Sequence, residues 1–385
     1  MAKYKLGDIC EIVSGSTPKT SIDEYWDGDV KWITPAELND DSYIISDSAR
    51  KITELAVKKT GLTSFPEGTV ILSSRAPIGK VAIAGCEMYC NQGFKNLICS
   101  DKIINKYLYW FLKRNIHFLN SLGRGATFKE ISKAIVSEIE INVPEIEQQK
   151  KVVEILEKVS GIIARRKKEL SALDDLIKAR FVEMFGDPVV NEKGWMTKPL
   201  LDMGQCKNGM NFHYDDKGIE INCLGVGDFK NLSVIDNTEE LPTVSLNEMP
   251  SEEYLLKDED IVFVRSNGNK ALVGRSLAVY PGNVPTTFSG FCIRYRKHDN
   301  EIIVPYLLRV LKTDSVRVKM AGRGANIQNL NQQILGTLII PVPPIELQEQ
   351  FADFVKQVDK SKVAVQKALE KTQLLFDSLM QQYFG

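Results

Sequence analysis

Polar and basic side chains recur at matching places in the two halves of the chain, on segments rich in turn-forming residues. Arg75 and Arg265 each end a run of apolar, β-branched residues. Lys80 and Arg275 each follow a glycine at the start of the next such run. Arginine suits bidentate hydrogen bonding to guanine edges, and asparagine or glutamine suits adenine edges. The residue types therefore favour hydrogen bonding to the base edges of DNA.

The candidate DNA-contacting residues lie on predicted loops and strand ends. They are Lys19, Lys31, Arg75, Lys80, Arg124, Arg265, Asn267, Asn269, Lys270, Arg275, Arg323 and Asn326. In the first half, Asn91 and Gln92 offer amide groups for the same role. Arg124 and Arg323 each lie between glycines, where the backbone can approach another surface closely. Each residue taken singly also fits a solvated loop position or a structural salt bridge. The Gly-Arg-Gly element also fits a structural turn into the strand before a long helix.

Motifs for catalysis and for metal binding are missing from the sequence. A methyltransferase needs a glycine-rich cofactor loop and a motif of the Asn-Pro-Pro-Tyr kind, and neither occurs. The nearest match to a phosphate-binding loop, at 78–81, lacks the hydroxyl residue and the upstream glycine spacing. The only nuclease-like fragment, Asp187-Pro188, has the reverse order of the usual motif. The acidic triplet at 258–260 fits a solvated turn before a strand. We therefore expect no catalytic residues, no metal site and no cofactor in this chain.

Composition sets the broad class of the protein. The 385 residues suffice for two domains, and the 43% apolar and 26% charged content is ordinary for a globular protein. Seven scattered cysteines without a CxxC pair, and three isolated histidines, favour buried thiols in a reducing compartment over a zinc site. No apolar run approaches the ~20 residues of a membrane span, so we expect a cytoplasmic protein without membrane contact. The net charge is −1, so any basic surface is local or is supplemented by partner subunits.

The chain repeats one plan twice. The segment Leu122-Gly-Arg-Gly-Ala matches Ala321-Gly-Arg-Gly-Ala, and Val143-Pro-Glu-Ile-Glu-Gln-Gln matches Val342-Pro-Pro-Ile-Glu-Leu-Gln at the same offset. Upstream the offset drifts to a smaller value, since Thr69–Arg75 aligns with Glu259–Arg265. Each copy therefore has a constant part and a divergent part, which indicates that the divergent parts of the two copies have been free to recognise different targets.

The constant parts read as long helices. Apolar residues at spacings of four and three run through 147–185, interrupted at Arg166 and Arg180, and the same seam recurs from Phe351 to Tyr383. Each helix is ~55–60 Å long at ~1.5 Å per residue, and an antiparallel coiled coil buries both seams. A further helix is expected from Asn105 to Leu119, with its counterpart at 304–311. We predict an α+β fold of two tandem mixed domains, 1–143 and 187–342. Each is followed by a helical region, 144–186 and 343–385, and pseudo-twofold symmetry relates the copies.

Several of these segments resemble the specificity subunits of Type I restriction–modification systems. The opening Lys5-Leu-Gly-Asp-Ile-Cys-Glu-Ile-Val-Ser-Gly-Ser-Thr-Pro and the segment Tyr25-Trp-Asp-Gly-Asp-Val-Lys-Trp-Ile-Thr-Pro-Ala-Glu-Leu are similar to the start of their target recognition domains. The most specific likeness is Val143-Pro-Glu-Ile-Glu-Gln-Gln with its second copy, which resembles the entry to the family's helical regions. The second copy lacks the Thr-Pro and Tyr-Trp elements, which fits a different target.

The resemblance implies a non-catalytic subunit that binds double-stranded DNA. Each recognition domain would read half of a bipartite target, and the helices would set the gap and dock two methyltransferase subunits. Motor-nuclease subunits would complete the complex, and S-adenosylmethionine, ATP and magnesium would belong to those partners. Two alternatives stay open. A protein–protein scaffold would explain the helices and the missing catalysis but not the drifting offset. A self-sufficient restriction enzyme would need a catalytic site that the sequence does not display.

Overall fold

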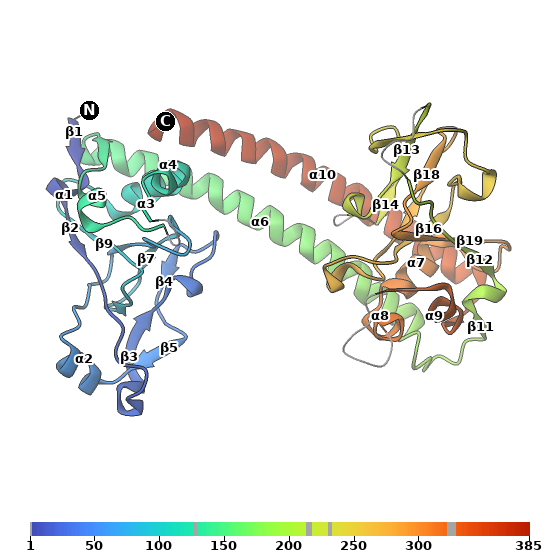
Figure 1. The fold of residues 1–385 in the computed structure, drawn as a ribbon, viewed down its shortest axis with the longest axis horizontal. Helices are drawn as coiled ribbons and strands as arrows, with labels where there is room; N and C mark the ends of the chain where they lie inside the picture. The colour runs from blue at the N-terminus through green and yellow to red at the C-terminus, as the bar shows by residue number, and fades with distance from the viewer. Residues whose placement is uncertain (1, 126–128, 213–217, 230–232, 322–328) are drawn as a thin grey trace. The chain divides into compact units, whose positions relative to one another are not determined.

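A computed structural model describes residues 2–125, 129–212, 218–229, 233–321 and 329–385 (Figure 1). The chain forms two compact units. The first unit contains residues 1–168 and 366–385, and the second contains residues 169–365. Each unit therefore includes part of both long helices, α6 (Ile146–Phe185) and α10 (Ile345–Phe384).

The first unit has three sheets. A five-stranded sheet has the order β2-β9-β6-β7-β4, with β2 Cys10–Val13, β9 Asn96–Cys99, β6 Val70–Leu72, β7 Val81–Ala84 and β4 Ile44–Ile45. A three-stranded sheet has the order β5-β3-β8, with β5 Arg50–Ile52, β3 Trp26–Ile33 and β8 Tyr89–Cys90. β1 (Ala2–Lys5) pairs antiparallel with β10 (Glu140–Val143). The helices before α6 are α1 (Leu6–Ile9), α2 (Glu54–Thr60), α3 (Asn105–Arg114), α4 (Ile116–Ser121) and α5 (Lys133–Ser137).

The second unit repeats this topology. Its five-stranded sheet has the order β12-β19-β16-β17-β14, with β12 Gly204–Asn208, β19 Cys292–Lys297, β16 Asp260–Val264, β17 Ser276–Val279 and β14 Val234–Ile235. Its three-stranded sheet is β15-β13-β18, with β15 Thr243–Leu246, β13 Ile219–Leu224 and β18 Thr286–Phe288. β11 (Thr197–Pro199) pairs with β20 (Ile339–Pro341). The helices before α10 are α7 (Val304–Lys312), α8 (Asp314–Ala321) and α9 (Gln332–Gly336). The predicted class of two tandem mixed domains, each followed by a long helix, is confirmed.

The central strands are apolar on both faces because each face is covered. In β6, Val70 and Leu72 belong to the core that contains α3, while Ile71 belongs to the core shared with the three-stranded sheet. In β16, Ile261 and Phe263 face the helices, and Val262 faces the other way. Alternate residues of a strand point to opposite faces, so a strand buried on both sides reads as a continuous apolar run.

The strand register corrects one sequence alignment. Val70 lies opposite Ile83 in β7, and Ile261 lies opposite Ala278 in β17. Ile83 and Ala278 are equivalent because β4 and β14 pair with them in the same way. Val70 therefore corresponds to Ile261, whereas the sequence alignment paired it with Asp260. A slip of one residue changes the face on which a side chain lies.

The helix expected from Asn105 to Leu119 is two helices, α3 and α4. Asn115 has a non-helical backbone (φ −98°, ψ 23°), and its Nδ2 donates to Phe111 O at 2.9 Å. Asparagine favours such local hydrogen bonds over the regular helix, which explains the break. The apolar face is buried as predicted, at Leu108, Phe111, Leu112 and Leu119.

Within each unit, α6 and α10 run antiparallel. In the second unit Lys362 pairs with Asp174, and Phe351 packs on Phe181 and Phe185 farther along α6. In the first unit Arg166, one of the two interruptions of the seam, donates to Ala368 O and Thr372 Oγ1. The polar interruption thus joins the two helices. The predicted antiparallel coiled coil is confirmed for the helix segments within each unit.

A buried glutamine ties each long helix to its domain. Gln149 accepts from Ile104 N at 2.8 Å, and its Nε2 donates to Lys102 O at 2.9 Å and Pro144 O at 2.8 Å. Gln348, its equivalent in the second copy, makes the same three bonds with Ile303 N, Glu301 O and Pro343 O. Both side chains are fully buried. The constant part of the repeat is therefore the junction of helix and domain.

The acidic triplet expected to be a solvated turn is only partly so. Asp258 and Glu259 are exposed, but Asp260 is fully buried. Its carboxylate accepts from Arg296 Nε and Nη2, each at 2.7 Å, and from Lys257 N at 2.7 Å. The turn prediction is wrong for Asp260, because a buried carboxylate needs partners, and its arginine partner lies 36 residues away in the sequence.

Candidate nucleic-acid interface

In the first unit, two predicted arginines meet at the end of β6. Arg75 forms an isolated antiparallel bridge with Glu130, and Arg124 bridges the same residue through two backbone hydrogen bonds of 3.0 Å. Arg75 Nη1 lies 3.9 Å from Glu130 Oε2, and its side chain is 35% exposed. Among the described residues this long contact is the one ion pair of Arg75, and it uses only part of the donors of the guanidinium. Arg124 is exposed.

A third cation at this place was missed by the sequence analysis. Lys95 is 7% exposed, and its Nζ lies 3.2 Å from both Glu130 Oε1 and Ser74 Oγ. Glu130 therefore lies between the charges of Lys95 and Arg75 and compensates the buried one. The polar residues of the run Asn91-Gln-Gly-Phe-Lys95, which follows a strand, could have marked this segment as a candidate DNA-contacting loop. The local sequence does not show, however, that Lys95 is buried rather than exposed to solvent.

The Gly-Arg-Gly element of the first unit opens a short backbone pairing with Glu130. It does not lead directly into the strand before the long helix, since α5 lies between that pairing and β10. The following residue, Ile131, donates its backbone N–H to Ser74 O at 3.0 Å. The element thus serves as a turn that presents Arg124 beside Arg75, and the structural and binding readings of it are compatible.

The remaining predicted lysines of the first unit lie away from Glu130. Lys80 is half-buried, and its Nζ donates to Pro35 O at 3.0 Å, so one of its three donors is already used. Lys31, on β3, has its Nζ 3.3 Å from Cys86 Sγ. Lys19 is exposed on the loop before β3, and Thr17 of the same loop donates to Gln92 Oε1 at 2.5 Å. That bond joins the first loop to the segment that carries Lys95.

In the second unit, Arg265 occupies the position of Ser74 rather than that of Arg75. Arg265 N donates to Phe291 O at 2.8 Å and Leu330 N donates to Arg265 O at 2.7 Å, as Ser74 bonds with Gly93 and Ile131 in the first unit. The prediction that Arg75 and Arg265 are equivalent is therefore wrong by one residue. Arg265 is half-buried, and its Nη1 donates to Gly290 O at 3.2 Å. Beside it Phe291 is 61% exposed, an aromatic face that sequence reasoning missed.

The asparagines after Arg265 shape their own loop. Asn267 Oδ1 accepts from Asn269 N at 2.8 Å, and Asn269 Oδ1 accepts from Ala271 N at 3.1 Å. Such turns use the amide oxygen as the acceptor, and the NH₂ group takes no part in them. The side chain of Lys270, and all of Arg323 and Asn326, lie outside the described residues.

Arg275 and Lys80 are equivalent, as predicted. Val264 N donates to Arg275 O at 2.9 Å, as Ser73 N donates to Lys80 O at 2.9 Å. Arg275 is half-buried. Burial lowers the pKa of Arg317, and the positive charge of Arg275 lowers it further, so the two guanidinium groups lie near enough to repel each other. Both units therefore place a cation at the residue directly before β7 or β17.

Two general features complete the description of the site. Among the described residues, no group of three or more His, Cys, Asp or Glu side chains is placed to hold a metal ion. None of the helices in the described ranges combines the length and the apolar character that crossing a membrane requires.

A family model for the Type I restriction modification DNA specificity domain matches residues 1–173 and again residues 192–374. The chain belongs to this family. The double match and the repeated fold make it a specificity subunit with two target recognition domains.

Curated relatives and solved structures agree with the family. The MjaIX specificity subunit of Methanocaldococcus jannaschii is 40% identical over 225 residues, which are 54% of this chain and about half, 52%, of that relative. The MjaVIII specificity subunit of the same organism is 23% identical over 95% of this chain and 89% of its own length. The S subunit of M. genitalium superposes with a TM-score of 0.59 at 15% identity, covering 100% of this chain and 96% of that chain. A chain from a structural study of complex assembly in the type I R-M system gives a TM-score of 0.62 at 15% identity, with 100% and 97% coverage. These structural likenesses support the fold.

Proposed function

We propose that each target recognition domain reads one half of a bipartite DNA sequence, and that the chain carries out no catalysis itself. One contrast carries the proposal. The junctions of helix and domain repeat their hydrogen bonds residue by residue through Gln149 and Gln348. The strand ends at the polar loops differ, with Arg265 in the place of Ser74 and Phe291 in that of Gly93. A constant framework with divergent polar loops is what two readers of different half-sites require.

The long helices provide the second part of the proposal. They set the gap between the half-sites and dock two methyltransferase subunits. Leu176 and Leu375 occupy matching positions on α6 and α10 and are 47% and 53% exposed. Exposed apolar side chains often mark protein–protein contacts, and their presence at matching positions of both helices fits the docking of two copies of one partner. S-adenosylmethionine, ATP and magnesium would then be bound by the methyltransferase and motor-nuclease subunits.

The near-neutral charge of the chain is compatible with this division of labour. With 49 basic and 50 acidic side chains, the chain offers no global attraction to DNA phosphates. The methyltransferase subunits would supply much of the backbone grip, while this chain supplies the contacts to base edges. Phosphate contacts give affinity, whereas base contacts give specificity.

Alanine variants of Arg75 and Arg265 test the assignment of the loops. Binding of the assembled methyltransferase complex is measured against a library of target sites, with Lys193→Ala, an exposed position outside α6, α10 and the polar loops, as the control. A base-contacting arginine should lose ~1–3 kcal/mol at one base pair of one half-site. Arg75→Ala and Arg265→Ala should affect opposite half-sites. Equal weakening for all sequences would mark phosphate contacts, and no difference from Lys193→Ala would contradict the assignment.

The scaffold alternative makes a different prediction. A chain that only assembles other subunits would leave the sequence specificity of the complex unchanged when the recognition domain of the first unit is exchanged for that of a relative. The proposed function predicts instead that only one half of the recognised sequence changes.

A further inference from the structure

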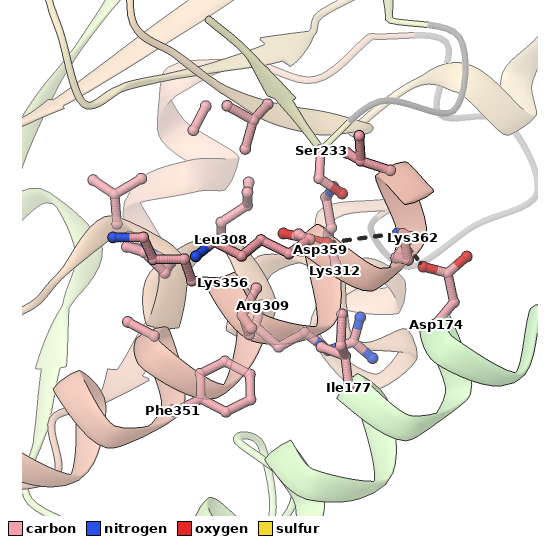
Figure 2. Close-up of a pocket in the computed structure, with 18 of the residues that line it drawn as sticks. Asp174, Ile177, Ser233, Leu308, Arg309, Lys312, Phe351, Lys356, Asp359 and Lys362 are labelled. Carbon is pink, nitrogen blue, oxygen red and sulfur yellow. Dashed lines mark hydrogen bonds and ion pairs between the residues drawn. The ribbon is translucent and has the colours of Figure 1, made fainter. Parts of the chain in front are cut away.

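The second unit contains a pocket of about 570 Å³ beside the long helices. The pocket is lined by residues of α7, α10, the end of α6 and the edge strand β14 (Figure 2). All of its lining residues belong to the second unit, 169–365. None of the predicted DNA-contacting residues that the structure describes lines it.

Aromatic rings occupy the matching place in the first unit. Tyr43, just before β4, packs on Tyr109 and Trp110 of α3, with ring centroids 4.9 and 5.9 Å away. Trp110 packs in turn on Phe376 of α10, at 5.6 Å. The Tyr43 hydroxyl donates to Glu157 Oε1 of α6 at 2.5 Å. Four rings and one carboxylate thus close the space between sheet, helix α3 and the long helices.

Hydrogen bonds fix the correspondence between the two units. Tyr43 O accepts from Ile83 N at 2.7 Å, and Ser233 O accepts from Ala278 N at 2.9 Å, so Ser233 replaces Tyr43. In α3 and α7, Tyr107 and Tyr306 donate to the equivalent carbonyls of Asn142 and Pro341.

The offset between Tyr107 and Tyr306 also gives the other replacements. In the second unit Leu308 stands for Tyr109, Arg309 for Trp110, Ile177 for Phe376 and Lys356 for Glu157. All five replacing residues, Ser233 included, line the pocket. The pocket is the space that the missing rings leave.

The exchange also reverses the charge. The acidic acceptor Glu157 becomes Lys356, and the uncharged Trp110 becomes Arg309. Arg309 Nε is buried and has no hydrogen-bond partner among the described residues. The lining carries five cationic side chains, Arg309, Lys312, Lys356, Lys360 and Lys362, against two acidic ones, Asp174 and Asp359. Both acids lie against Lys362, at 2.6 and 3.8 Å, and Figure 2 shows them around it. The other cations keep a surplus of positive charge.

The surplus raises the free energy of the empty pocket. Burial, and then the nearby charges of Arg309 and Lys362, lower the pKa of Lys312 to about 8. Asp174 and Asp359 act in the opposite direction but do not restore the ordinary pKa of Lys312, whose Nζ donates to the neutral Ser233 Oγ at 2.7 Å. An anion in the pocket would relieve the repulsion and give the Arg309 Nε an acceptor.

We propose that this pocket binds a small aromatic carboxylate, with the ring where the first unit holds its own aromatic side chains and the carboxylate toward Arg309 and Lys356. Buried Leu308, Ile177 and Phe351 form the apolar wall for the ring. A bicyclic arene suits a space from which more than one ring is missing. The proposal is independent of how the loops contact DNA.

The test is isothermal titration calorimetry of the full-length chain with 2-naphthoate. Two further probes separate the contributions: 2-naphthamide keeps the rings without the charge, and acetate keeps the charge without the rings. We expect 2-naphthoate to bind with one site per chain and at least ~10-fold more tightly than either probe, a difference of ~1.4 kcal/mol. No heat of binding for 2-naphthoate, or equal binding of 2-naphthamide, would overturn the proposal.

Variants locate the site. Ser233→Tyr restores the side chain of the first unit and should abolish 2-naphthoate binding, whereas Arg309→Met should remove the preference for 2-naphthoate over 2-naphthamide. Tyr43→Ser is the matched control, since it opens the first unit beside Glu157 instead of a lysine and should add no second site. Thermal unfolding of each variant checks that it is folded. Unchanged binding by a folded Ser233→Tyr variant, or an unchanged preference in Arg309→Met, would refute the assignment.

Discussion

Replacing Gln149 by alanine should release the first unit from its long helix while leaving the second unit unchanged. The fully buried side chain makes three hydrogen bonds to backbone groups, of 2.8, 2.9 and 2.8 Å. Each bond contributes ~1 kcal/mol net, and the backbone groups left behind stay buried without a partner. At ~1 kcal/mol for each of the three bonds, the local loss should be ~3 kcal/mol.

Hydrogen exchange of the Ile104 amide measures this loss directly, because Ile104 N donates to Gln149 Oε1. A loss of ~3 kcal/mol corresponds to exchange about 100-fold faster, at ~1.4 kcal/mol per factor of ten. Gln148→Ala changes the exposed neighbour and should leave the rate unchanged. Gln348→Ala should accelerate the Ile303 amide and leave Ile104 protected. If Gln149→Ala exchanged no faster than Gln148→Ala, the glutamine would not be the anchor that the hydrogen bonds indicate.

Three further changes probe other parts of the account. Asp260→Asn breaks the buried pair with Arg296 and should cost ~3–5 kcal/mol in urea unfolding, against almost nothing for exposed Asp236→Asn. Seven residues inserted at matching points of α6 and α10 keep the seam in phase and add ~10 Å, so the gap in the methylated motif should grow by about three base pairs; an unchanged gap would refute the spacer role. Lys312→Met should stabilise the protein by ~3 kcal/mol at pH 7, because burial lowers the folded pKa of Lys312 from 10.5 to about 8 and each pKa unit corresponds to ~1.4 kcal/mol. Between pH 8 and pH 10.5 the unfolded chain binds more protons than the folded chain, so the stability of the wild type rises with pH over this range. Thermal unfolding curves should therefore show the difference in stability between Lys312→Met and the wild type disappearing as the pH rises. A difference that does not depend on pH would contradict burial of the charge as the cause.

The sequence predicted the repeated plan and the long helices because these depend on spacing within the chain. Apolar residues three and four apart must lie on one side of a helix, so the seams of α6 and α10 follow from local pattern alone. The constant offset of the helical regions also placed Gln149 opposite Gln348 in the alignment. Their role could not be read from it, because the bonding partners Lys102 and Ile104 lie 47 and 45 residues away.

The polar loops were predictable as a set but not in register. Arg75 and Arg265 both follow an apolar strand, which suggested equivalence, yet hydrogen bonding in the sheet shifts them by one position. Lys95 escaped notice because its burial depends on Glu130, which reaches it only through the fold. The pocket of the second unit was equally invisible, since it lies where the second unit lacks the four aromatic rings that the first unit holds.

The most direct test of the account is a methylome. The chain is co-expressed with its cognate methyltransferase subunit, and methyladenine is mapped by single-molecule sequencing. Two tandem readers predict one bipartite motif with a fixed unspecified gap, of which one half alone changes when residues 1–143 are exchanged for those of a relative. A single continuous motif, or methylation that does not depend on this chain, would contradict the conclusion that its two domains read the two halves of the target.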